Sequence, residues 1–188
     1  MKVIIILCLT GIALHLFYLL YKQVLGRAVS SANKTISHIV VFTLLNCFMV
    51  FTGYYLATSL TPMMPQTAHW ISIALFFFIG LKMTGNIRKG KSVQWTFDTS
   101  KFNILLLFSL TSSFDAFFTG IALGFYSEYS FIWFLCFAGF LILLLLMAKV
   151  MAEQSSATRS VWLIAALGAS LIGLNAIIIL IEWLVKLV

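Results

Sequence analysis

An aspartate lies near the middle of a strongly apolar stretch of this chain. Asp115 occurs in the segment 111–120, with the sequence TSSFDAFFTG. A charged side chain at the centre of a bilayer costs about 2.5 to 3.5 kcal/mol on insertion scales, and such residues usually mark a transport or relay site. Thr111 and Thr119 share a four-residue spacing with Asp115, and Ser112 lies beside them on a helix. One helix face thus combines a carboxylate with hydroxyl oxygens.

Polar residues of other apolar segments could meet Asp115. His15 is close to the middle of the first segment, Asn46 lies in the second, and Asn175 lies in the sixth. Buried polar side chains in membrane helices usually face other helices rather than lipid. The polar residues of four helices are therefore predicted to converge on one interior.

Each of these residues also has a structural interpretation. Asp115 could be a structural carboxylate, capped by Thr111 and Ser112 or paired with Lys82. His15 could be a neutral histidine hydrogen-bonded between helices. Lys82 lies about one turn from the end of its segment, which favours an ammonium that snorkels to the interface. Four residues at segment ends are assigned to interfacial belts: His69, Trp70, Glu182 and Trp183.

The composition identifies a polytopic membrane protein. Of the 188 residues, 62% are hydrophobic and only 9% are charged, and the mean hydropathy of +1.09 is far above that of a soluble domain. Six spans of about 20 apolar residues are predicted, at residues 2–22, 36–59, 69–87, 101–125, 130–150 and 161–185. We therefore predict an all-α protein with one membrane domain over 1–188, surrounded by the lipid bilayer.

The basic residues predict the orientation. They concentrate in the first, third and fifth connections, as Lys22, Arg27, Lys34, Arg88, Lys89, Lys91, Lys101, Lys149 and Arg159, whereas the second and fourth connections have none. The positive-inside rule then places the three basic connections, including 88–100, in the cytoplasm and both termini outside. Nucleic acid is not an expected partner of this net charge of +7, because no connection is long enough to form a binding domain.

Short matches in the same order indicate an internal repeat. Residues 79–82 (IGLK) match 172–175 (IGLN), and 51–54 (FTGY) match 137–140 (FAGF). We predict two three-helix repeats, about 1–90 and about 101–188. Because three spans are an odd number, the second repeat enters the membrane in the opposite sense, as in many transporters.

Small residues predict where helices pack closely. Ser112, Ala116, Gly120 and Gly124 recur every four residues, a spacing that lets helices approach closely in lipid. The repeated Gly80 and Gly173 are expected to form a second close contact.

Several classes of protein are not expected. The first segment is not a typical removable signal peptide, because its apolar character continues to Tyr21 without a small-residue cleavage site. Cys8, Cys47 and Cys136 are isolated, which argues against disulfides and zinc clusters. No nucleophile with an adjacent base, HExxH motif or glycine-rich phosphate loop occurs, so we predict no enzyme and no tightly bound cofactor.

Three segments resemble the MntP-type manganese exporters of the LysE transporter superfamily. They are 68–83, which ends in FIGLKM, 167–174, and 111–123, which carries Thr-Ser-x-x-Asp-Ala-x-x-x-Gly around Asp115. Length, six spans and paired halves agree, so the resemblance covers nearly the whole chain. It implies a multi-pass protein of the bacterial inner membrane that exports divalent manganese, with Asp115 at the ion site.

One departure from that family changes the site. The family carries a second aspartate in its first helix, and the corresponding stretch 12–17 (IALHLF) has His15 instead. Asn46 stands where the family tends to have glutamine, which keeps an amide oxygen. One carboxylate and one imidazole leave net positive charge around a dication. The change could shift selectivity toward zinc, nickel or cobalt, make His15 a proton carrier, or mark a relative that no longer transports.

The predicted function is export of a divalent cation, manganese first, by alternating access. Asp115, Thr111, Ser112, Asn46 and His15 are expected to bind the ion, with Asp115 and His15 as metal ligands. The sequence has no ATP-binding loop, and the membrane potential opposes cation export by about 2.3 kcal/mol per charge per 100 mV, so proton antiport is expected. Export of an amino acid or other small solute and a non-transporting membrane scaffold stay open, as does the oligomeric state, a homo-oligomer included.

Overall fold

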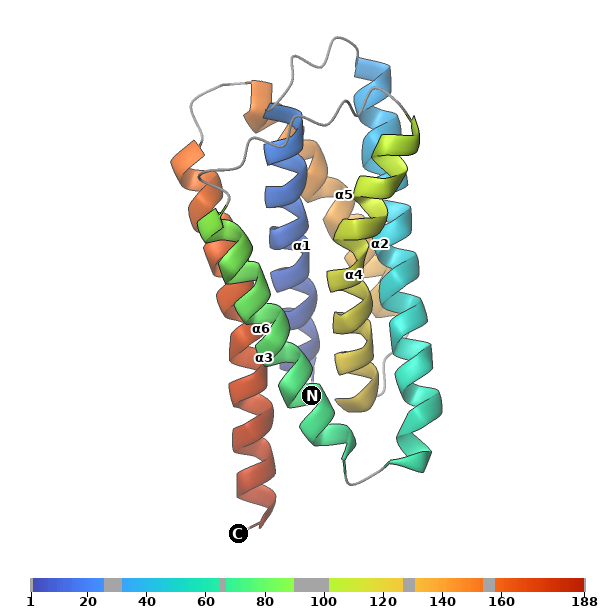
Figure 1. Cartoon of the computed structure of the whole chain (residues 1–188), viewed down its shortest axis with the longest axis vertical. Coiled ribbons are helices and arrows are strands. Elements are labelled where there is room, and N and C mark those ends of the chain that lie inside the picture. Colours follow the sequence, from blue (N-terminus) through green and yellow to red (C-terminus); the bar gives the residue numbers. More distant parts are fainter. Residues whose placement is uncertain are drawn as a thin grey trace.

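The computed structural model describes residues 2–25, 32–64, 67–89, 102–126, 131–153 and 158–187. Six long helices account for nearly all of them (Figure 1): α1 (Lys2–Leu25), α2 (Ala32–Leu60), α3 (Ala68–Lys89), α4 (Phe102–Tyr126), α5 (Phe131–Glu153) and α6 (Thr158–Leu187). A 3-10 turn, η1 (Thr61–Met63), follows α2, where Pro62 lacks the N–H needed to continue an α-helix. The prediction of an all-α protein is confirmed, and each predicted span coincides with one helix to within a few residues.

The helices carry the surface of a membrane protein. Within the described residues, α1, α2, α3 and α6 contain apolar stretches long enough to cross a bilayer, and α5 contains a shorter one, Ile132–Ala148. Large apolar side chains such as Leu44, Phe77 and Leu163 are exposed on the outside of the bundle. Acyl chains can cover such side chains, whereas in water they would form an unusually large apolar patch. The protein is a multi-pass membrane protein.

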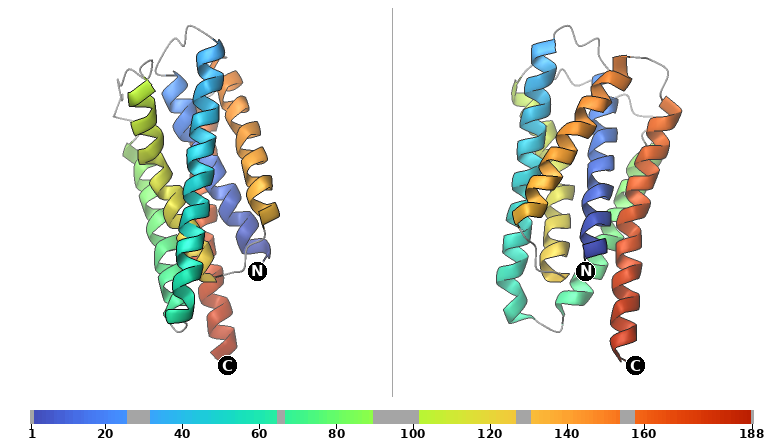
Figure 2. Two further views of the ribbon diagram at one scale, coloured as in Figure 1. Left: turned by 90° about the vertical axis from the view of Figure 1, so that its right-hand side faces the viewer. Right: turned by 180° about the vertical axis from the view of Figure 1, so that it is seen from behind.

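Successive helices run in opposite directions through the bundle (Figures 1 and 2). The last turns of α1, α3 and α5 and the first turns of α2, α4 and α6 lie at one end, the upper end in Figure 1. The basic residues that the helices contain near this end are Lys22, Lys34, Arg88, Lys89, Lys149 and Arg159. The predicted cytoplasmic positions Arg27, Lys91 and Lys101 fall outside the described residues. The charges that predicted the orientation and that lie within the described residues are thus at one end of the molecule.

Each helix packs mainly on helices from the other half of the chain. The first helix, α1, contacts α5 and α6, and α4 contacts α2 and α3. Further contacts join α3 to α6, α2 to α5 and, less extensively, α1 to α4. The two sequence halves are therefore interleaved in one bundle rather than standing as separate bodies.

Glycines permit the closest of these contacts. A Cβ atom added at Gly120 would lie 2.2 Å from the Val50 carbonyl oxygen, and one at Gly53 would lie 2.2 Å from the Phe117 oxygen. Gly124 meets α2 in the same way, 2.6 Å from the Tyr54 oxygen. Such distances are far below van der Waals contact, so α2 and α4 touch backbone to backbone.

Two further glycine contacts hold α6. Cβ atoms added at Gly11 and Gly168 would lie 2.9 Å and 2.8 Å from each other's carbonyl oxygens, which joins α1 to α6. On α3, a Cβ at Gly80 would lie 3.2 Å from the Gly173 Cα, whereas one at Gly173 would meet no atom of the described residues within 4 Å. The contact between α3 and α6 thus depends on Gly80 more than on Gly173.

Candidate ion-binding site

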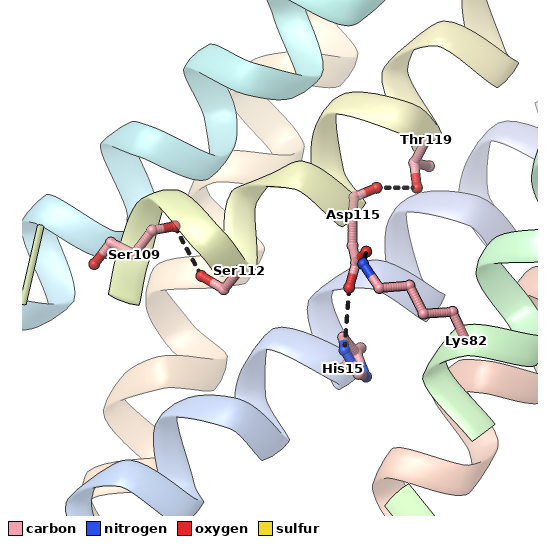
Figure 3. Close-up of polar contacts among 6 residues, drawn as sticks. All are labelled: His15, Lys82, Ser109, Ser112, Asp115 and Thr119. Carbon is pink, nitrogen blue, oxygen red and sulfur yellow. Dashed lines mark hydrogen bonds and ion pairs between the residues drawn. The ribbon is translucent and has the colours of Figure 1, made fainter. Parts of the chain in front are cut away.

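The carboxylate of Asp115 is buried between three helices. It projects from the middle of α4 toward α1 and α3 (Figure 3), and the residue is only 5% exposed. Its Oδ2 lies 3.8 Å from Nε2 of His15 on α1, and its Oδ1 accepts a hydrogen bond from Nζ of Lys82 on α3. The two residues predicted to share a site, Asp115 and His15, are therefore neighbours, although they are one hundred positions apart in the chain.

For Lys82 the sequence favoured an ammonium that snorkels to the interface, and a pair with Asp115 was the alternative. Its Nζ instead forms an ion pair with Asp115. The helix α3 continues to Lys89, so Lys82 is about two turns from its end and has less reach to the interface than the shorter predicted span indicated. The signal that could have identified it was its position as the one basic residue inside the apolar part of that segment.

His15 is completely buried, and neither of its ring nitrogens has a hydrogen-bond partner among the described residues. The distance of 3.8 Å to Asp115 is longer than a hydrogen bond. On its other side, α6 approaches so closely that a Cβ at Gly168 would lie 3.2 Å from the His15 backbone nitrogen. The imidazole is therefore held next to the carboxylate with its nitrogens free to take a ligand.

The hydroxyl groups predicted to assist Asp115 have other partners. Thr111 lies on the exposed side of α4 and donates to the Leu107 carbonyl oxygen at 2.8 Å. Ser112 is buried but donates to the Ser109 oxygen at 2.8 Å, and Figure 3 shows it directed away from Asp115. Thr119 donates to the backbone oxygen of Asp115 at 2.7 Å. These residues support the helix around the site, and the structure does not bring Thr111 or Ser112 to the carboxylate.

Two amide side chains keep a free oxygen in the interior. Asn46 and Asn175 are fully buried, and each Nδ2 donates to a backbone oxygen one turn earlier in its helix. Neither Oδ1 has a hydrogen-bond partner in the part of the chain that the structure describes. Asn46 shares a face of α2 with Val50, whose carbonyl oxygen touches Gly120, so it faces the part of α4 around Asp115.

The donor set is suited to one cation with mixed ligands. Among the described residues, no three histidine, cysteine, aspartate or glutamate side chains come together. Metal bonds to carboxylate oxygen and imidazole nitrogen are each about 2.1 Å long, so two of them span up to about 4.2 Å. The separation of 3.8 Å between Asp115 Oδ2 and His15 Nε2 is within that span, so a single ion can contact both atoms.

A second polar contact lies at the opposite end of the bundle from the basic residues. Tyr126 at the end of α4 donates to Glu182 of α6, and the ring of His69 lies 6.0 Å from that of Tyr126. Trp70 and Trp183 also pack together, with ring centroids 4.8 Å apart. The residues assigned to interfacial belts thus also join α3, α4 and α6 to one another.

Comparison with known proteins gives one match. A family model described as "Putative manganese efflux pump" matches residues 29–180. This range contains Asn46, Lys82 and Asp115 but begins after His15. No curated protein and no solved structure matches the chain.

Proposed function

The chain belongs to the MntP family, a family of membrane metal efflux transporters, and from this premise we propose that it exports a divalent cation, manganese first, through a site at Asp115. The family match covers more than three quarters of the chain, with all of α2, α3, α4 and α5 and most of α6. Asp115 is the one carboxylate at the middle of the described helices. The ion is the transported substrate and not a resident cofactor.

The observation that carries this proposal is the approach of Asp115 Oδ2 to His15 Nε2 at 3.8 Å inside the bundle. Both residues are buried, and they come from helices α1 and α4, which make only a limited contact with each other. An ion bound there would bridge the two halves of the chain. Asn46, with its free amide oxygen, is proposed as a third ligand, since hard cations such as manganese prefer oxygen.

The helix contacts support an inverted repeat. If α1, α2 and α3 are exchanged for α4, α5 and α6 respectively, the pair α2–α4 becomes α5–α1 and the pair α1–α6 becomes α4–α3, while α2–α5 and α3–α6 map onto themselves. Under this exchange His15 corresponds to Asp115, and Lys82 corresponds to Asn175 in the repeated IGLK and IGLN. We propose a pseudo-two-fold axis in the membrane plane with the ion site next to it, as in transporters built from inverted repeats.

The glycine contacts indicate which helices move together. Backbone contact at Gly53 and Gly120 joins α2 to α4, and contacts at Gly11 and Gly80 join α1 and α3 to α6. Asp115 belongs to the unit of α2 and α4, whereas His15 and Lys82 belong to the unit of α1, α3 and α6. We propose that alternating access moves these two units against each other, with the ion held between them.

Energy for export must overcome the membrane potential. With the basic helix ends in the cytoplasm of a bacterial inner membrane, as the positive-inside rule predicts, outward transport of a dication costs about 4.6 kcal/mol at 100 mV, twice the single-charge value. We propose that proton antiport supplies this energy, with His15 as the proton carrier because its imidazole lies next to the carboxylate of Asp115.

Everted membrane vesicles provide the test, since exported ions accumulate inside them. Vesicles from cells that lack their own exporters but contain this chain should accumulate radioactive manganese when a pH gradient is imposed, and more slowly zinc, nickel and cobalt. Accumulation of an amino acid without any metal would favour the solute exporter. A folded, abundant protein that moves neither class of substrate would favour the scaffold.

Replacing His15 by aspartate should raise manganese affinity about tenfold and favour manganese over zinc. The introduced carboxylate would face Asp115 and neutralise the second charge of the ion, and loss of the imidazole removes a ligand that suits zinc. Competition binding of the two metals to purified protein measures the change. His69→Asp, at the other end of the bundle, is the matched control, and an equal effect there would contradict the prediction.

A further inference from the structure

The two oxygens of the Asp115 carboxylate face two different groups. Oδ1 accepts the hydrogen bond from Lys82 Nζ, and Oδ2 faces His15 Nε2 at 3.8 Å. The ammonium is thus seated on the same carboxylate that a bound metal ion would use through its other oxygen, and it would lie next to the ion. With one negative and one positive charge, the Asp115–Lys82 pair is neutral as a whole.

We propose that Lys82 is a tethered cation that occupies the carboxylate of Asp115 in the empty transporter, and that the metal ion binds by displacing its ammonium. This inference rests on the proposed function and adds to it the competitor that an arriving ion must displace. A lysine carries a compact charge on a flexible four-carbon chain, which lets it leave and return without rearrangement of the helix.

The burial of the three side chains supports displacement of Lys82 rather than of its neighbours. The Lys82 side chain is 39% exposed, whereas those of Asp115 and His15 are 7% and 0% exposed. In Figure 3, Lys82 extends across from α3, while His15 and Asp115 come from α1 and α4. Lys82 is therefore the least enclosed of the three side chains, and it can move away while the two buried ligands stay in place.

Charge balance explains what this exchange would achieve. An unpaired carboxylate at the middle of a membrane protein is costly, so the empty site needs a countercharge until the next ion binds. Lys82 supplies it without a second substrate. When the metal ion is bound, the displaced ammonium repels it. This repulsion lowers the affinity of the site for the ion, so that the ion can be released.

The exchange also connects binding to movement. The Asp115–Lys82 ion pair joins α4, in the unit of α2 and α4, to α3, in the unit of α1, α3 and α6. Among the described residues, glycine contacts lie within each unit and not between them. Displacement of Lys82 removes this link only when an ion has taken its place. The empty transporter would thus be held in one conformation until the metal ion arrives.

Manganese binding to the purified full-length protein in lipid nanodiscs tests the inference, with free manganese counted by electron paramagnetic resonance. The comparison needs the wild type, Lys82→Met, Lys82→Arg, and Lys82→Met combined with Asp115→Asn. Lys82→Met should bind manganese at least about tenfold more tightly than the wild type, which is about 1.4 kcal/mol. Lys82→Arg, which keeps the charge, should bind no more tightly than the wild type, and the double variant should not bind.

The possible outcomes separate this inference from the proposed function. Asp115-dependent binding that is unchanged or weaker in Lys82→Met would overturn the role of Lys82 alone. No manganese binding by any folded variant would overturn the proposed function and this inference with it. If Lys82→Met does not fold, labelling of the Lys82 amine in the wild type decides: manganese should increase the labelling, and no increase would overturn the inference.

Discussion

Asp115→Asn is expected to slow metal export at least about 100-fold while the protein still reaches the membrane. The variant keeps the size of the side chain but removes the one negative charge of the buried site. Removing one partner of a buried charge pair costs about 2 to 5 kcal/mol, and each 1.4 kcal/mol is a factor of ten. Lys82 would in addition keep an unpaired positive charge that repels the ion. Initial rates of manganese uptake by everted vesicles measure the effect.

Glu182→Gln is the matched control for this prediction. It makes the same chemical change at the far end of the bundle, where the side chain accepts a hydrogen bond from Tyr126 that an amide oxygen can also accept. We expect its export rate to stay within about twofold of the wild type. Equal export by wild type and Asp115→Asn, at equal abundance in the membrane, would exclude Asp115 as the ion ligand.

Gly120→Ala is expected to be strongly destabilising, although it adds only one methyl group. The added Cβ would lie 2.2 Å from the Val50 carbonyl oxygen, and backbone cannot move aside as a flexible side chain can. Overpacking of this kind costs about 3 kcal/mol, which for a chain of this size lowers the unfolding temperature by roughly 10 °C. The fraction of monodisperse protein in detergent after heating measures the change.

Gly139→Ala tests whether close packing is the cause. Within the part of the chain that the structure describes, a Cβ at Gly139 would meet no atom within 4 Å, and alanine is a better helix former than glycine by about 1 kcal/mol. Its unfolding temperature should therefore be unchanged or slightly higher. If the two variants behave alike, the contact between α2 and α4 is not as tight as the structure shows.

The sequence predicted the helices because their signal is local. Runs of about 20 apolar residues need no knowledge of the fold, since each must satisfy its own backbone hydrogen bonds in lipid. The motif around Asp115 likewise led to the family that the later comparison matched over residues 29–180. The basic residues could also be assigned to connections from the sequence, because their number and order are properties of the chain alone.

Side-chain direction was harder to predict, and Thr111, Ser112 and Lys82 illustrate why. Spacing placed Thr111 and Ser112 near Asp115, but both hydroxyls bond within α4, because a free backbone carbonyl is available one turn earlier. Lys82 was expected to snorkel, yet it reaches Asp115 on another helix. Both results depend on how the helices are rotated about their axes, which many weak packing contacts decide together.

The sequence by itself determined an all-helical membrane protein with one central carboxylate, because hydrophobicity and charge act over a single segment. Only the tertiary structure decided that His15, Lys82 and Asp115 meet, since this requires α1, α3 and α4 to come together from both halves of the chain. Glycine contacts hold α1 and α3 against α6, and α4 against α2. Charge pairing in a low-dielectric interior depends on distance, so the properties of the ion site arise from the packing.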